Sequence, residues 1–279
     1  GRASISLATS GGFSGHYSGT SHSFSVSVLA GEGTAMERDY DYSSARHRSE
    51  LEDATQIGRQ AGEKAVRRLG ARKVKSGQVP LVYDPRVSGG LVGHFAGAIS
   101  GAAVARGTSF LKNSMDQMVF APGITITDDP TRKRGRGSKP FDGEGVTAQP
   151  LTLIDDGRLA TWLLDTSTAK QLGLASNGRA ARGTGSTPSP STTNLTLLPG
   201  TLSPEELIAD IKSGFYITEM IGMGVNGVTG DYSRVASGFW IENGELTFPV
   251  SEVTVAGNLK TMFAEMSVAN DLIYRAATN

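Results

Sequence analysis

The sequence predicts an α+β fold that is dominated by antiparallel strands and contains a buried, glycine-rich helix. Short runs in which apolar and polar residues alternate recur along the chain, and several are separated by hairpin turns. A few other segments place apolar residues three and four positions apart, as amphipathic helices do. One of them, residues 87–109, consists mostly of Gly, Ala, Ser and short aliphatic residues. Many short strands joined by tight turns favour antiparallel pairing.

Composition limits the classes of partner. The 279 residues carry a formal net charge of +0, which does not favour nucleic acid or an anionic membrane surface. No apolar run reaches the ~20 residues of a membrane helix, and the N-terminal residues contain no apolar signal-peptide core. The chain has no Cys, which excludes disulfides and thiolate metal sites and fits a cytoplasmic protein. No linker marks an internal boundary, so we treat residues 1–279 as one region.

The N-terminal segment predicts strands followed by one helix. Residues 3–30 alternate as strands, with a hairpin turn at Gly11-Gly12, and the polar residues 31–47 read as a loop or an edge strand. A helix is predicted to begin with Ser49 as its cap and to end at Gly70. Its buried stripe is predicted to comprise Leu51, Ala54, Ile57, Ala61, Ala65 and Leu69.

The glycine-rich segment follows a short buried strand, residues 79–85. Its apolar residues recur with helical spacing, and glycines stand one turn apart at positions 93, 97 and 101. Each glycine costs a helix roughly 1 kcal/mol relative to Ala, so a close approach to the helix backbone is expected. We favour tight packing inside the core, with another subunit or an extended ligand as the alternatives. No G-x-G-x-x-G or G-K-[ST] motif supports nucleotide binding.

The remainder of the chain predicts further strands with three short helices. Strands are expected at residues 124–127, in a hairpin over 151–164, at 192–198, and in an antiparallel set after residue 214 with its best turn at Asn243-Gly244. Helices are expected at residues 166–173, from Ser203 to about 213–214, and from 259 to about 268.

The residue pattern by itself indicates no catalytic centre. No G-x-S-x-G motif is present, and the four histidines are scattered without an adjacent glutamate. The carboxylate pairs Asp128-Asp129 and Asp155-Asp156 stand in turn contexts, where solvated side chains that serve the backbone are expected.

Several longer motifs resemble the TldD/PmbA family, and in particular its PmbA/TldE branch, once described as a modulator of DNA gyrase. The matching segments are LVGHFAGAISGAA, RGTSFL, KPFDGEGV, DGRLATWLLDTSTAKQLGL, SPSTTNL, GMGVNGVTGDYSRVASGFWIENGE and PVSEVTVAGNL. The resemblance covers essentially the whole chain and is most specific in the last 60 or so residues. It implies the C-terminal, larger part of the family chain, and we expect the family's N-terminal domain and final strands to lie outside this sequence.

The resemblance implies a zinc metallopeptidase built from two related subunits. The catalytic TldD subunit carries its zinc ligands in an H-E-x-x-x-H helix and in a later Cys, and it acts on unfolded peptides inside a cavity. Counting back from the R-G-T-S that begins at Arg106, the motif positions fall on Val92, Gly93 and Gly97, none of which can bind metal or transfer a proton. His94 is one position away from the motif, and the Cys is missing.

We therefore expect no catalytic residue and no metal in this chain. The chain is expected to be a PmbA/TldE-like subunit that forms a heterodimer with a zinc-bearing TldD-like subunit, or a homodimer, and contributes to the peptide cavity. By family resemblance the substrates are unfolded peptides, as in microcin maturation and antitoxin degradation. Two alternatives stay open: an independently active metallopeptidase with an unrecognised site that uses His94, His16 or His22, and a peptide-binding module. The candidate cavity residues are His94, Thr193, Asn194, Asp231, Tyr232 and Ser233.

Overall fold

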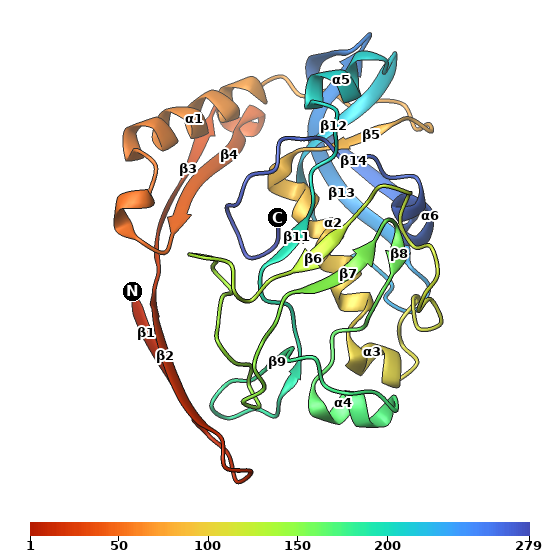
Figure 1. The fold of residues 1–279 in the computed structure, drawn as a ribbon. Helices are drawn as coiled ribbons and strands as arrows, with labels where there is room; N and C mark the ends of the chain where they lie inside the picture. The colour runs from red at the N-terminus through yellow and green to blue at the C-terminus, as the bar shows by residue number, and fades with distance from the viewer.

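The computed structural model describes all residues, 1–279, and confirms the α+β fold with mainly antiparallel strands (Figure 1). The first 69 residues, here called the N-terminal part, form two hairpins and one long helix. The elements are β1 (Arg2–Ala8), β2 (Ser14–Thr20), β3 (His22–Ala30), β4 (Glu37–Ala45) and α1 (Ala54–Arg67). The β1–β2 hairpin extends along one side of the molecule, and α1 packs on β3 and β4 (Figure 1).

Residues 76–279, here called the C-terminal part, contain two four-stranded sheets. The first has the order β14-β13-β12-β5, in which only β5 is parallel to its neighbour, and the second has the order β11-β6-β7-β8. The first sheet comprises β5 (Leu81–Tyr83), β12 (Ser213–Ile221), β13 (Asp231–Glu242) and β14 (Glu245–Asn258). The second comprises β6 (Ile126–Asp128), β7 (Leu151–Asp155), β8 (Arg158–Leu159) and β11 (Leu195–Leu197), and a separate pair joins β9 (Ala180–Ala181) to β10 (Ser189–Pro190).

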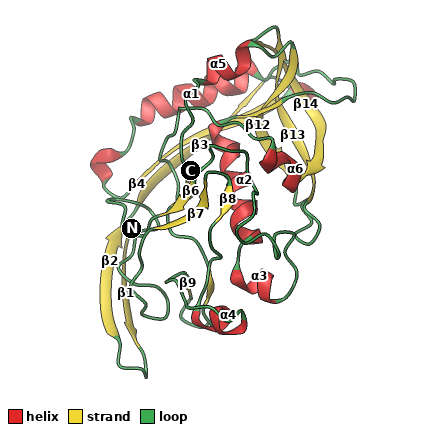
Figure 2. Cartoon of the chain, turned by 45° about the vertical axis from the view of Figure 1, so that its right-hand side comes forward, coloured by secondary structure: helices red, strands yellow, loops and turns green.

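Helix α2 (Pro85–Ala98) lies between these two sheets (Figures 1 and 2). Pro85 occupies its first turn, and the Asp84 side chain caps it by accepting a hydrogen bond from the Arg86 amide. The remaining helices are short. They are α3 (Gly101–Ala105), α4 (Thr166–Gln171), α5 (Pro204–Ala209) and α6 (Leu259–Ala264). None of the helices has the length and apolar character required to cross a lipid bilayer.

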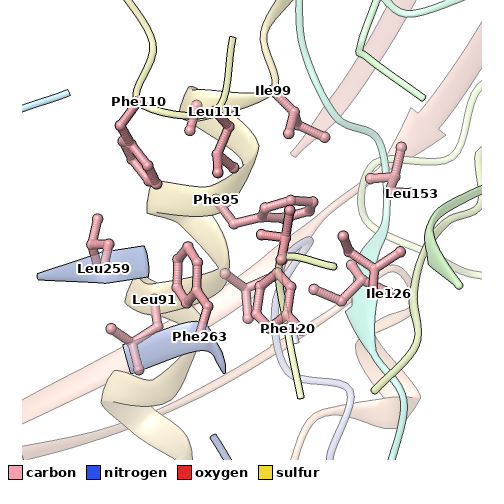
Figure 3. Close-up of a cluster of buried hydrophobic side chains, with 14 of the residues drawn as sticks. Leu91, Phe95, Ile99, Phe110, Leu111, Phe120, Ile126, Leu153, Leu259 and Phe263 are labelled. Atoms are coloured by element: carbon pink, nitrogen blue, oxygen red, sulfur yellow. The ribbon is translucent and has the colours of Figure 1, made fainter. Parts of the chain in front are cut away.

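Aromatic rings fill the core beneath α2 (Figure 3). Phe120 and Phe263 stack with ring centroids 4.5 Å apart, and Phe95 of α2 meets Phe120 edge-on at 5.1 Å. Such pairs contribute roughly 0.5–1.5 kcal/mol each beyond the area they bury. The position and rotation of α2 are therefore fixed by the face that carries Phe95.

Charged side chains join the N-terminal part to the C-terminal part. Arg86 of α2 donates to Asp39 of β4 at 2.8 Å. Glu219 of β12 accepts from Arg38 at 2.8 Å and from Arg68 at 2.6 Å. These ion pairs hold β4 and the end of α1 beside the N-terminal half of α2. Farther along, Phe13 of the first hairpin packs edge-on against Phe141 of the C-terminal part.

The same charges explain why residues 31–47 were predicted only as a loop or an edge strand. Residues 37–45 form β4 and pair along their whole length with β3. The buried face of β4 carries Asp39, Asp41 and Ser43 in place of apolar residues. A strand with acids on its inner face gives no apolar alternation, so its pattern resembles that of an exposed connection.

The predicted start of the first helix is wrong by four to five residues. The segment 48–50 forms a separate 3₁₀ turn, and the Glu52 amide donates to the Ser43 hydroxyl of β4. That tie keeps the chain extended until Asp53, whose side chain caps α1 by accepting from the Gln56 amide. The buried stripe is correspondingly shorter and consists of Ile57, Ala61 and Ala65.

Three other segments differ in length from the prediction, and one of them is α6, which ends at Ala264 and not at about 268. The glycine-rich segment is broken between α2 and α3, because the Gly101 amide donates to the Leu163 carbonyl instead of continuing the helix. Helix α5 ends at Ala209, several residues before the predicted 213–214. The Ile211 and Lys212 carbonyls accept from the turn at Gly244 and Asn243, and β12 begins at once. The predicted hairpin turn at Asn243-Gly244 is confirmed, with both residues at positive φ.

A buried ion pair overturns part of the prediction for the carboxylate pairs. Asp155 and Asp156 do lie at an exposed turn, but Asp128 has no exposed surface and pairs with the equally buried Arg179, Nε to Oδ2 at 2.5 Å. Asp128 also accepts from the amide and hydroxyl of Thr193. The carboxylate thus ties the end of β6 to two distant loop residues that its sequence neighbours do not reveal.

Removing Asp128 is expected to destabilise the fold strongly. In Asp128→Ala the guanidinium of Arg179 stays buried without its counter-charge, which typically costs about 3–5 kcal/mol. Chemical denaturation of the variant and of the natural chain measures this difference. Lys73→Ala, which removes an exposed pair with Glu252, is the control and should leave the midpoint unchanged. Equal midpoints for Asp128→Ala and the natural chain would contradict this account of the pair.

Candidate functional site

Helix α2 has two unlike faces. Leu91, Phe95 and Ala98 are buried in the core, whereas Gly93 and Gly97 are exposed on the other side. A Cβ atom added at either of these glycines would meet no other heavy atom within 4 Å. The expectation that this glycine stripe packs tightly inside the core is therefore wrong for positions 93 and 97, and the helix backbone is bare and open there.

Gly101 is the exception, because it is the glycine of the stripe that packs closely against neighbouring residues. A Cβ at this position would lie 2.8 Å from the Leu163 carbonyl oxygen and 2.7 Å from the Thr168 hydroxyl. The close approach of backbone predicted for the stripe is thus confirmed at Gly101 only.

His94 lies at the boundary between the two faces of α2. Its ring meets Tyr232 of β13 edge-on, with ring centroids 5.9 Å apart. The buried Nε2 atom has no hydrogen-bond partner. Burial, and then the positive charge of Arg234, lower the pKa of His94 below its usual 6.5, so the imidazole is neutral at pH 7.

Tyr232 and Arg234 lie beside this imidazole, and Tyr83 lies beside Tyr232. The Tyr232 hydroxyl donates to the Met220 sulfur at 3.0 Å, while the Tyr83 hydroxyl is buried and unpartnered. Burial, and then the neighbouring Tyr232, raise the pKa of Tyr83, which therefore stays protonated and can donate a hydrogen bond. Arg234 of β13 has a buried Nε atom with no partner. We call His94, Tyr83, Tyr232 and Arg234 the polar cluster.

A cavity of about 280 Å³ lies next to the polar cluster, where the N-terminal and C-terminal parts meet. Arg234 belongs to both, and a Cβ on Gly90 of α2 would lie 3.9 Å from its Nη1 atom. The cavity therefore runs beside the first of the exposed glycines of α2. Its lining consists of Tyr40, Arg86, Val87, Gly90, Glu219, Met220 and Arg234.

The residues at the expected metal position do not fit a zinc ion. Val92 points into the core, Gly93 and Gly97 have no side chains, and His94 supplies a single imidazole beside the cation Arg234. No group of three His, Cys, Asp or Glu side chains that could hold a metal ion occurs anywhere in the chain. His16 and His22 lie on different strands, β2 and β3, without further ligands. A zinc site needs three protein ligands in one place.

The structure brings together only two of the predicted cavity residues, His94 and Tyr232. Thr193 and Asn194 are buried, and their side chains are engaged by Asp128, Gly137, Ser138 and Asp129. Those hydrogen bonds hold the loop after β6 to the start of β11.

Asp231 and Ser233 flank Tyr232 on β13 and are both exposed. The Asp231 carboxylate accepts from the Thr229 hydroxyl and the Asn258 amide, and these two hydrogen bonds lower the pKa of Asp231. The Ser233 amide donates to the Gly224 carbonyl. Both residues therefore support the loop that precedes β13.

Sequence reasoning missed Tyr83, Arg234 and the remainder of the cavity lining. Tyr83 ends a strand that reads as plain core, and Glu219 is far from α2 along the chain. The available signal was Arg234, a charged residue two positions after Tyr232 and so on the same face of its strand.

Comparisons with known proteins come from sequence and from structure. Residues 76–279 match a family model described as the PmbA/TldA metallopeptidase C-terminal domain, and residues 2–69 match one described as the central domain. Metalloprotease PmbA of Escherichia coli O157:H7 is 39% identical over 261 residues, which make up 93% of this chain and 56% of that protein. A PmbA homologue of Haemophilus influenzae is 38% identical over the same shares. The chain thus spans just over half the length of the curated relatives it matches.

Solved structures share the fold. A proposed modulator of DNA gyrase from Bacteroides thetaiotaomicron superposes with a TM-score of 0.86 at 33% identity, over 96% of this chain and 59% of that one. TldE from Thermococcus kodakarensis gives a TM-score of 0.86 at 23% identity, over 96% of this chain and 61% of that one. At that identity the match supports only a shared fold.

Two glycines of the stripe should respond in opposite ways to an added methyl group. Gly93→Ala is expected to raise stability by about 1 kcal/mol, because the site is open and Ala favours the helix. Gly101→Ala is expected to lower stability, because its Cβ would meet a backbone oxygen at 2.8 Å. Thermal unfolding of both variants measures this. A loss of stability in Gly93→Ala would show that its face is packed.

The pKa of His94 should lie below the usual 6.5 of a histidine in an NMR titration. Because the folded chain binds the proton less readily than the unfolded chain, His94 makes stability fall as pH drops below 6.5, until the folded pKa is reached. Arg234→Gln removes the second cause and should raise the pKa of His94, while His94→Gln should remove this part of the pH dependence. A His94 that titrates at or above 6.5 would contradict the burial described here.

Proposed function

Because the chain belongs to the PmbA/TldD metallopeptidase family, we propose that it is a metal-free, PmbA/TldE-like subunit of a two-subunit zinc metallopeptidase. In this proposal the zinc and the catalytic residues belong to a TldD-like partner. This chain forms the dimer with that partner and lines part of the cavity that holds unfolded peptide. The assembly acts in the cytoplasm, and its substrates are peptides of the kind cleaved in microcin maturation and antitoxin degradation.

The open glycine face of α2 is the observation that carries the proposal. By the family resemblance of the motifs, this helix segment would correspond to the zinc-binding helix of the active paralogue. Here Gly93 and Gly97 leave the backbone bare, and His94 has no second ligand near it. A helix without side chains on one face leaves room for another main chain to pass close by. An extended peptide is the ligand that such a surface suits.

The chemistry of this subunit is then binding and not bond cleavage. Its neutral imidazole, its protonated Tyr83 and the bare helix can position a peptide and exclude water from it. When zinc is bound in the partner, it supplies an activated water and polarises the scissile carbonyl. The residues of this chain hold the substrate and transfer no proton to it.

The first test is assembly with a partner. The full-length protein mixed with its TldD-like partner is expected to form a heterodimer in size-exclusion chromatography and to cleave an unstructured peptide in a zinc-dependent manner. The full-length protein by itself should cleave nothing. Peptide cleavage by the isolated protein would contradict this proposal. Loss of that cleavage in His94→Ala, His16→Ala or His22→Ala would favour the independently active enzyme, and unchanged cleavage in all three would exclude it.

A bulky side chain on the open face should obstruct substrate without unfolding the protein. Gly97→Phe is expected to form the heterodimer normally and to reduce peptide cleavage on the order of 10-fold or more, because a displaced substrate loses its reactive alignment. Gly97→Ala is the matched control and should cleave at the natural rate. Full cleavage by a Gly97→Phe complex would show that peptide does not pass this face.

A further inference from the structure

The cavity beside α2 contains several charged groups, and all but one are neutralised by partners. Arg86 donates to Asp39 at 2.8 Å and to Asp84 at 3.2 Å. The two carboxylate oxygens of Glu219 are held by Arg38 and Arg68. The remaining charged group of the lining is Arg234.

Arg234 has no ion-pair partner. No Asp or Glu oxygen lies within 4.0 Å of its guanidinium nitrogens. Nη2 donates a long hydrogen bond, 3.4 Å, to the Met220 carbonyl, and the guanidinium lies beside the neutral Tyr232 hydroxyl. Its Nε atom is buried and unpartnered. A half-buried guanidinium that keeps donors unused is costly unless something occupies them. Arg234 is therefore a cationic hydrogen-bond donor that has no anionic partner within this chain.

The surroundings of Arg234 define what that anion can be. The buried Tyr83 hydroxyl lies beside Tyr232, and the charge of Arg234 acts on both Tyr83 and His94. The cavity, at about 280 Å³, is at the lower end of the ~300–1,000 Å³ that ligand sites occupy. It therefore suits one residue of a longer ligand. Guanidinium nitrogens in a fixed fork match the two oxygens of a carboxylate.

We propose that Arg234 binds a carboxylate of the peptide that lies along the open glycine face of α2. This assignment rests on the proposed function, because it takes that peptide as the ligand. The Arg234 Nη1 atom lies against Gly90, at the start of the open face, so a carboxylate held there would fix the register of a chain that runs toward Gly93 and Gly97. Arg234 is thus a specificity residue that selects peptides by the position of a negative charge.

The carboxylate has two sources, the C-terminus of the peptide or an acidic side chain, and three probes distinguish them. All are acetylated ten-residue peptides of Gly, Ser and Ala. One has a free C-terminus, one is amidated and neutral, and one is amidated with a single central Glu. Binding is measured by calorimetry on the full-length protein alone and on its complex with the TldD-like partner after zinc is removed by chelation, so that no peptide is cleaved.

At least one carboxylate-bearing peptide is expected to bind roughly 10-fold more tightly than the neutral peptide, because it forms a charge-assisted hydrogen bond with Arg234 that the neutral peptide cannot form. The peptide with the higher affinity identifies whether the bound carboxylate is the C-terminus or an acidic side chain. Arg234→Gln should abolish the gain and leave the affinity for the neutral peptide unchanged. Arg234→Lys, which keeps the charge without the fork, should retain part of the gain. Arg59→Gln removes an exposed arginine of α1 and is the control that should retain all of it.

Three outcomes would overturn the assignment. They are equal affinity for all three peptides, no measurable binding of any of them, and an equal loss for all three in Arg234→Gln and in Arg234→Lys. Failure of the complex to assemble would contradict the proposed function instead, and the measurements on the full-length protein alone would still decide whether Arg234 selects a carboxylate.

Discussion

Helix α2 has one face that must be buried and one that has no side chains to bury, and the arrangement of the remaining chain depends on this asymmetry. Phe95 is held by Phe120 and Phe263, so the helix cannot rotate without opening the core. With that face fixed, Gly90, Gly93 and Gly97 must point the other way. Glycines in a helix reduce its stability, and aromatic packing offsets the cost. The result is a rigid helix with an accessible backbone.

Charge fixes the position of the N-terminal part relative to that helix. The acids on the inner face of β4 meet arginines from α1 and α2, and Glu219 completes the group from β12. Pairs of this kind add little net stability, but they define one geometry because each misplacement leaves a buried charge unpaired. Against this background of paired groups, the unpaired guanidinium of Arg234 stands out as a functional feature and not as part of the scaffold.

The sequence predicts those features of the fold that depend on residues close together in the chain. The cap at Ser203, the turn at Asn243-Gly244 and the apolar stripe of α2 act within a few residues, and each lies where the pattern predicts. The sequence fails where partners are distant. Asp128 resembles a turn residue until Arg179, 51 positions later, is seen to neutralise it. Likewise, β4 resembles a loop until arginines from other elements reach its acids.

The site shows the same division. His94 and Tyr232 can be proposed from the sequence, because each lies within a glycine-rich motif. Tyr83 cannot, because its significance comes from packing, and for Arg234 the sequence offers only its place on the same strand face as Tyr232. Whether a glycine stripe is packed or open is also decided by elements far away in the chain. The sequence could predict a close approach somewhere along the glycine stripe, but not that it occurs at Gly101 while Gly93 and Gly97 stay open.

The central claim is that the open face of α2 binds peptide and no metal, while zinc belongs to the partner. Anomalous diffraction at the zinc edge, from crystals of the full-length protein in complex with its TldD-like partner, tests this directly. The account predicts a zinc peak within the partner and none at residues 92–97 of this chain. A zinc peak within bonding distance of His94 would contradict it.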